Sequence, residues 1–163
     1  MTIEDDPTQP RVVLVAPQEP PWMAYAKGKI GVHELAGSQD NAYIVQILRA
    51  CGLSDQHDET AWCSAFLNDC MAVGAHVAGT GRANARSWLH WGQEIATPRY
   101  GCVVVLSRPP DPAHGHVGLY AGEHGAVIEI LGGNENNQVM IKDYPRDRLL
   151  SYRWPIGIDL PTA

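Results

Sequence analysis

The feature that most restricts the fold is a change of hydrophobic pattern near Pro98. Before it, apolar residues recur at intervals of three and four positions, which predicts helices over residues 21–29, 41–51, 58–74 and 84–91. After it, short apolar segments separated by turn residues predict strands over 102–107, 116–122, 126–131, 138–144 and 149–154. Because the connections between these strands are short, neighbouring strands should pair antiparallel. Helices followed by strands predict an α+β domain.

A chain of 163 residues has the length of one domain with a full hydrophobic core. The first residues are rich in proline and acidic side chains, so we expect an extended N-terminal arm over residues 1–20. The domain itself should run from residue 21 to about residue 158. No internal repeat and no second domain are visible in the sequence, and we expect a monomer.

Charge and hydropathy exclude several classes of partner. The net charge is −6 and no block of Lys or Arg exists, so the chain lacks the basic patch that binds nucleic acid or anionic lipid. No segment of 18 apolar residues is present, so we expect no membrane span. The start, "MTIEDDPTQP", lacks the basic and apolar regions of a signal peptide. We therefore expect synthesis in the cytoplasm, with delivery elsewhere by another machine or by lysis.

The segment "DETAWCSAFLNDC", residues 58–70, places a cysteine near the start of a predicted helix. Thr60 is a good N-cap, and Cys63 then lies in the first helical turn. Free N–H groups and the helix dipole at that position favour a thiolate, so Cys63 is a candidate nucleophile. The alternative is a buried apolar cysteine, because free cysteine is among the most buried residue types. The four cysteines form no C-x-x-C pair, which is a poor zinc or disulfide pattern.

A thiolate nucleophile needs a base and a group that orients the base. His116 follows a glycine at the start of an apolar strand, so it can face the helix from the rim of the sheet. In a hairpin of strands 116–122 and 126–131, its neighbour should lie just past residue 131. Asn134 is therefore the first choice as orienting residue, Glu129 the second and Asn136 the third. The alternatives are a solvated histidine and a plain Gly-Gly-Asn turn.

These residues resemble the papain-like cell-wall hydrolases, the NlpC-type peptidases and CHAP amidases. The similarity lies in "WCSAF" on a helix, "GHVGLY" on a strand, and a polar residue on the next strand. Three longer segments resemble a small phage- and bacteria-borne branch of this group: "PWMAYAKGKIGVHELAGSQDN", "GTGRANARSWLHWG" and "YPRDRLLSYRWP". The resemblance therefore covers about residues 20–155. The chain departs from the family where a Pro-Gly-Asp turn often precedes the first strand, because it has Tyr100-Gly101-Cys102 there.

The resemblance implies a papain-like fold, with N-terminal helices packed on a five- to six-stranded antiparallel sheet. It implies Cys63 as nucleophile, His116 as base and Asn134 as orienting residue, with no metal and no cofactor. The substrate would be an amide of the peptidoglycan stem peptide.

The candidates for substrate binding are Trp62 and Ser64, beside the implied nucleophile, and Trp88 on the predicted helix 84–91. Core packing is the alternative for the tryptophans. The bond cleaved stays open among the muramic acid–L-alanine amide, the D-glutamate–diamino acid bond and the cross-bridge. The biological setting is a phage lysin released with a holin, or an antibacterial effector delivered by a secretion machine and matched by an immunity protein.

Other functions also fit parts of the sequence. A zinc hydrolase would use His114, His116 and His124 with Asp111 or Glu123, although no H-E-x-x-H motif is present. A non-catalytic module that binds cell wall is a second alternative. An acyltransferase is a third, because a thioester can be resolved by an amine as well as by water.

Overall fold

Helices precede strands along the chain in the computed structural model, which describes residues 18–162. The helices are α1 (Pro21–Gly28), α2 (Ala42–Ala50), α3 (Cys63–Ala75) and the 3-10 helix η1 (Ala85–His90). The strands are β1 (Gln93–Ile95), β2 (Val103–Arg108), β3 (Asp111–His124), β4 (Val127–Glu135), β5 (Gln138–Pro145) and β6 (Leu149–Trp154), with a short 3-10 helix, η2 (Arg146–Arg148), before β6. Most of the arm predicted for residues 1–20 lies outside the described residues.

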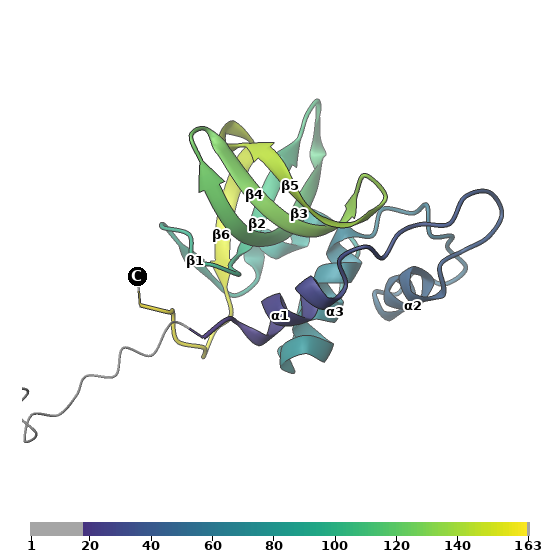
Figure 1. Cartoon of the computed structure of the whole chain (residues 1–163), viewed down its shortest axis with the longest axis horizontal. Helices are drawn as coiled ribbons and strands as arrows, with labels where there is room; N and C mark the ends of the chain where they lie inside the picture. Colours follow the sequence, from purple (N-terminus) through teal and green to yellow (C-terminus); the bar gives the residue numbers. More distant parts are fainter. Residues whose placement is uncertain (1–17, 163) are drawn as a thin grey trace, which may run out of the picture.

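The six strands form one antiparallel sheet in the order β1-β6-β2-β3-β4-β5. Figure 1 shows the sheet strongly curved, with the three α-helices gathered on one side of it. The predicted α+β class and the antiparallel pairing are therefore confirmed. Strand β1 was not predicted, because three residues are too few to show an alternating pattern.

Helix α3 is the centre of the helical layer and contacts α1, α2, β3 and β4. Gly74 permits a close approach to α1, because a Cβ there would lie 2.7 Å from the Cβ of Tyr25. The helix continues past this glycine to Ala75, and the C-cap residue His76 has a left-handed φ of 54°. The prediction that Gly74 ends the helix is therefore wrong.

Asp69 of α3 ties the helical layer together. Its carboxylate accepts hydrogen bonds from the phenol of Tyr25 on α1, at 2.8 Å, and from that of Tyr43 on α2, at 2.6 Å. The Lys29 ammonium lies over both rings, 5.2 Å and 4.5 Å from their centroids. Burial and the hydrogen bond to Asp69 raise the pKa of Tyr25 to about 12, so this phenol stays protonated and keeps donating.

The segment from Gly31 to Glu34, called here the edge segment, joins the helical layer to the sheet. Its backbone exchanges hydrogen bonds with Val139 of β5, and the N–H of Glu34 donates to Asn137 O at 2.9 Å. The carboxylate of Glu34 accepts from Trp62 Nε1 at 2.8 Å, one residue before α3. The start of α3 is thereby held to the β4–β5 turn. Within residues 18–162, no helix has the length and apolar character needed to cross a bilayer.

Candidate active site

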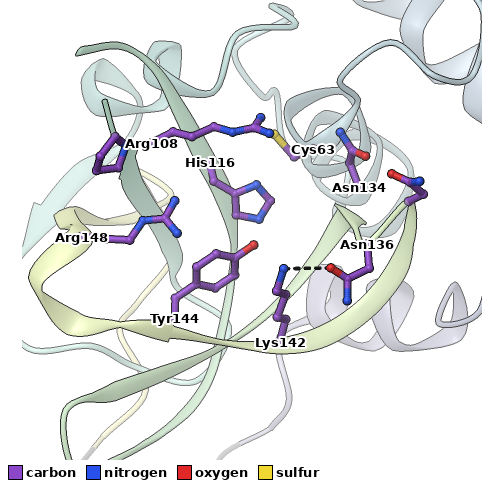
Figure 2. A pocket seen from close by; sticks show the side chains of 10 residues that line it. Cys63, Arg108, His116, Asn134, Asn136, Lys142, Tyr144 and Arg148 are labelled. Carbon is purple, nitrogen blue, oxygen red and sulfur yellow. Dashed lines mark hydrogen bonds between the residues drawn. The ribbon is translucent and has the colours of Figure 1, made fainter. Parts of the chain in front are cut away.

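A cleft of about 510 Å³ opens where the start of α3 meets the curved sheet. Figure 2 shows Cys63, His116 and Tyr144 facing this cleft. It is lined by Cys63, Arg108, Pro109, His116, Asn134, Asn136, Asn137, Lys142, Tyr144 and Arg148. The structure thus brings the predicted nucleophile and base into one cavity, although 53 residues separate them in the sequence.

Cys63 is the first residue of α3, whereas a cap at Thr60 would have made it the third. The N-cap residue is Trp62, whose side chain makes no capping hydrogen bond. Thr60 does not cap the helix, because its hydroxyl donates to Gln56 Oε1 at 3.1 Å instead. The first N–H groups of α3 therefore lack a side-chain acceptor, and the positive end of the helix dipole lies at the thiol.

The surroundings of Cys63 favour a thiolate. The side chain is buried, with 7% of the residue exposed, and burial alone raises the pKa of a thiol. The imidazole of His116 beside the sulfur and the backbone amide of Val117 have the opposite effect, and together they hold the pKa of Cys63 below its usual value. At Cys70 and Cys102 burial outweighs the groups that favour the thiolate, and it raises the pKa of both thiols.

His116 lies within β3, which begins five residues earlier than predicted. Burial lowers the pKa of its imidazole, but the Cys63 thiolate and the Glu135 carboxylate raise it to about 9. Its Nε2 is paired with Oε1 of Glu135, which leaves Nδ1 as the ring nitrogen available to the thiol. The arrangement therefore favours a thiolate next to an imidazolium, with the carboxylate behind the ring.

Glu135 takes the place predicted for Asn134. Between Gly132 and Glu135 the pairing of β4 with β5 shifts, so that three steps on β4 oppose two on β5. Asn134 adopts a left-handed φ of 57° in this bulge. An extra residue reverses which side chains face a given side of the sheet, so Glu135 turns toward His116 where an unbroken strand would present Asn134.

The other two candidates for the orienting role also lie elsewhere. Glu129 is near His124, with 3.7 Å between Oε1 and Nε2. Asn136 accepts a hydrogen bond from Lys142 Nζ at 3.0 Å, at the rim of the cleft. Sequence reasoning missed Glu135 because a bulge cannot be read from a Gly-Gly-Asn pattern. The available signal was a carboxylate directly after that run.

Tyr144 completes the support of the histidine ring. Its phenol donates to Oε2 of Glu135, and its ring stacks on the imidazole with 5.2 Å between centroids. Burial and Glu135 raise the pKa of Tyr144, so the phenol remains a donor. Both oxygens of the buried carboxylate are thus occupied, one by His116 and one by Tyr144. Gly132 leaves room for this cluster, because a Cβ there would lie 2.9 Å from Glu135 Oε1.

Trp62, Ser64 and Trp88 do not line the cleft, which corrects their prediction as substrate-binding residues. All three are fully buried. The hydroxyl of Ser64 donates to Arg82 O at 2.6 Å and accepts from Trp88 Nε1 at 2.9 Å. Each polar atom has an internal partner, so these residues stabilise the packing of α3 against η1 and the edge segment.

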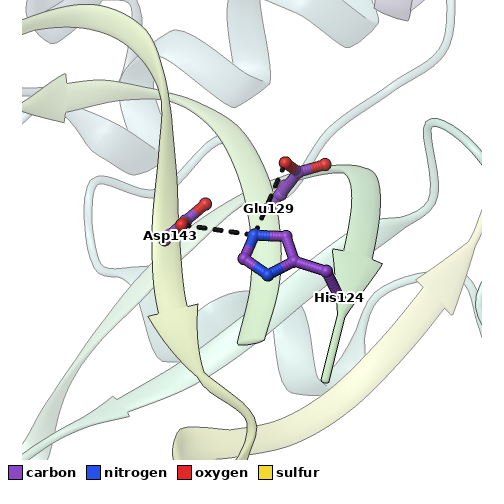
Figure 3. Close-up of side chains that lie close together, drawn as sticks. All are labelled: His124, Glu129 and Asp143. Atoms are coloured by element: carbon purple, nitrogen blue, oxygen red, sulfur yellow. Dashed lines mark ion pairs between the residues drawn. The ribbon is translucent and has the colours of Figure 1, made fainter. Parts of the chain in front are cut away.

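The histidines of the alternative zinc site fall into three separate places. His116 is paired with Glu135, and His114 lies against Asp111. His124 lies with Glu129 and Asp143, 3.4 Å from the latter, as Figure 3 shows. Within the part of the chain that the structure describes, this last trio is the one group with metal-ligand spacing, and all its members are accessible to solvent. The predicted zinc ligands therefore do not converge.

Neither a protein-family model nor a curated protein matches the sequence. Among solved structures, the crystal structure of the wild-type endolysin LysIME-EF1 is similar, with a TM-score of 0.54 and 14% sequence identity. The similarity covers 82% of this chain and 62% of that one, so this chain spans less than two thirds of that protein. At this identity the similarity concerns the fold, and the chain therefore shares its fold with an endolysin of known structure.

Proposed function

We propose that this chain is a peptidoglycan hydrolase of the papain-like NlpC/CHAP kind, cleaving an amide of the stem peptide through a cysteine nucleophile. The observation that carries the proposal is the pair of Cys63 and His116 in one cleft, with the buried carboxylate of Glu135 paired to the imidazole behind it. A thiolate, an imidazole and a group that orients the imidazole are what amide cleavage by a thiol requires. The resemblance of the sequence motifs and the fold shared with an endolysin support the choice of peptidoglycan as substrate.

In the proposed reaction, the Cys63 thiolate attacks the scissile carbonyl carbon and forms a tetrahedral oxyanion. The N–H groups at the uncapped start of α3 stabilise this oxyanion. The intermediate collapses, the C–N bond breaks, and Nδ1 of His116 donates its proton to the leaving amine. A water molecule then gives a proton to the neutral imidazole and attacks the thioester, which releases the acid and restores the thiolate. Glu135 holds the ring in one orientation throughout.

The direct test is a digest of purified peptidoglycan sacculi by the wild-type chain and by Cys63→Ala and Cys63→Ser. We expect new free amino and carboxyl termini by mass spectrometry from the wild type only, with thermal unfolding little changed in the variants. Activity that persists in Cys63→Ala, or that is lost on adding EDTA, would refute the thiol mechanism. Products with an added peptide mass in place of water would identify a transferase.

A second readout does not depend on finding the substrate. Iodoacetamide should label Cys63 well below pH 8.5, the usual pKa of a free thiol, because its pKa is lowered. Cys70 and Cys102 should stay unlabelled in the folded protein, since burial raises the pKa of each thiol. Preferential labelling of Cys102 in peptide mapping would contradict the assignment of Cys63.

We include both settings, a phage lysin and a delivered antibacterial effector, in this proposal. An effector requires an immunity protein that blocks the cleft, whereas a lysin does not. The product of the neighbouring gene, expressed and mixed with the purified chain, separates the two: inhibition of the digest at equimolar amounts indicates an effector.

A further inference from the structure

Three cationic side chains surround the thiol of a chain that is acidic overall. Arg108 comes from the end of β2, Lys142 from β5, and Arg148 from η2, and all three line the cleft. Figure 2 shows them around Cys63, His116 and Tyr144. The whole chain has a net charge of −6, so this concentration of positive charge is local. We call Arg108, Lys142 and Arg148 the cationic rim.

The cationic rim is held by neutral partners. Among residues 18–162, none of its three side chains forms a salt bridge with a carboxylate. Lys142 donates to the amide oxygen of Asn136, and Arg148 donates to Ser107 O at 2.9 Å and 2.8 Å. The carboxylate of Glu135 accepts from His116 and Tyr144 and forms no salt bridge with the rim.

Tyr144 positions part of the rim next to the reacting groups. The guanidinium of Arg148 lies 5.0 Å and the ammonium of Lys142 5.4 Å from the centroid of its ring. The same ring stacks on the imidazole of His116. An anion bound between these cations would therefore lie in the same cleft as the reacting groups. The thiolate and the Glu135 carboxylate offset the imidazolium and one rim cation, so positive charge remains for a ligand.

We propose, resting on the proposed function, that the cationic rim recognises a free carboxylate on a residue flanking the scissile amide. The substrate class is then an anionic stem peptide, and amidation of that carboxylate reduces cleavage. Arg108 is the exposed member, at the end of β2, and its planar fork suits a bidentate bond to a carboxylate. Arg148 is the fixed member, held by the backbone of Ser107.

The first experiment measures the electrostatics of the cleft without any peptidoglycan substrate. The rates at which anionic iodoacetate and neutral iodoacetamide alkylate Cys63 are compared at low ionic strength. We expect iodoacetate to be the faster reagent in the wild type, with the ratio of rates falling about fivefold in Arg108→Gln and again in Lys142→Gln. High salt should reduce the wild-type ratio, because it shortens the screening length to about 3 Å at 1 M. Arg49→Gln, an exposed arginine on α2, is the matched control and should leave the ratio unchanged.

The second experiment uses pairs of synthetic muropeptides that differ only in one carboxylate or carboxamide, at the glutamate or at the diamino acid. We expect one of these amidations to lower kcat/KM of the wild type about tenfold, through KM. The double variant R108Q/K142Q should lose that discrimination, so that it cleaves the carboxylate peptide and the amidated peptide at similar rates. Arg148 is left in place, because it also ties η2 to β2.

The two experiments separate the proposals. If the alkylation ratio is unchanged in both variants, or if carboxylate and carboxamide peptides are cleaved equally, the carboxylate site is overturned and the hydrolase stands. If the wild type cleaves no muropeptide, the hydrolase is overturned, and the alkylation ratio still decides whether the cleft selects anions.

Discussion

Replacing Glu135 by Gln removes the charge behind the imidazole of His116 and keeps the shape of the side chain. In the wild type, Glu135 accepts from both His116 and Tyr144. In the variant, the amide oxygen still accepts from the imidazole, and the phenol of Tyr144 can turn to accept from the amide N–H group. The geometry of the cluster should therefore survive, and the comparison isolates the charge.

The expected size of the effect follows from the change in hydrogen-bond type. A hydrogen bond to a charged group contributes about 1.5–3 kcal/mol and a neutral one about 0.5–1.5 kcal/mol, so the imidazolium loses roughly 1–2 kcal/mol of stabilisation. That loss corresponds to a pKa decrease of about one unit. Because the pKa of His116 is about 9 and an anion is being removed, its pKa must fall. The alkaline limb of kcat/KM, which reports loss of the imidazolium, should therefore move to lower pH.

The assay is a pH profile of kcat/KM on a soluble muropeptide, with thermal unfolding measured in parallel. We expect Glu135→Gln to lower the maximum roughly tenfold or more, as 1.4 kcal/mol per factor of ten implies. Glu135→Ala removes the orienting group as well and should lose on the order of a hundredfold. Asn134→Gly is the matched control: glycine accepts the left-handed φ of this position, and the loss should stay below tenfold.

Two results would refute this reasoning. One is a Glu135→Gln variant whose alkaline limb stays at the wild-type pH, which would mean that the carboxylate does not act on the imidazole. The other is an Asn134→Gly variant that loses more activity than Glu135→Gln, which would restore Asn134 as the orienting residue.

Three further predictions concern packing around the site. Gly132→Ala should lower activity more than stability, because the new Cβ would lie 2.9 Å from Glu135 Oε1. Gly133→Ala places a Cβ 2.6–2.8 Å from atoms of Trp62 and Phe66 and should instead lower the free energy of unfolding by about 1–3 kcal/mol. Measuring kcat and urea unfolding for both variants separates the two effects. Trp88→Phe should lose about 1 kcal/mol of stability in urea unfolding with KM unchanged, since its indole donates inside the core; a large KM effect would return it to the substrate site. Asp69→Ala should lower stability by about 2–3 kcal/mol, because two phenols lose their acceptor, while the rate of thiol alkylation stays at the wild-type value.

The sequence predicted the elements that depend on hydrophobic period and missed those that depend on local backbone geometry. Strand β6 has the predicted bounds, and β2 differs by one residue at each end, because both are apolar segments between turn residues. The start of α3 was misplaced because Thr60 has a cap-forming side chain but hydrogen-bonds within its own loop. A good capping residue is therefore not evidence of a cap until its acceptor geometry is known.

The candidate site shows the same division. The sequence places Cys63 on a helix and His116 on a strand through the hydrophobic patterns around them, although the predicted starts of α3 and β3 were wrong. Glu135 could not be found in this way, because one extra residue in β4 changes which side chain faces the imidazole. Trp62 was assigned to the cleft because it is next to Cys63 in sequence, whereas the structure buries its side chain in the core. An alternating hydrophobic pattern predicts which residues of a regular strand share a face, but it does not show where a β-bulge breaks that alternation.

The edge segment has a consequence for solubility. Strand β5 is the last strand of the sheet, and an exposed strand edge can pair with another chain and start aggregation. Gly31 to Glu34 occupy the hydrogen-bonding groups along the first part of that edge, through Asn137 and Val139. Farther along, Lys142 and Asp143 place charges on the strand, which discourages a second chain from docking there. The same segment that holds the start of α3 in place thus also shields the sheet from intermolecular pairing.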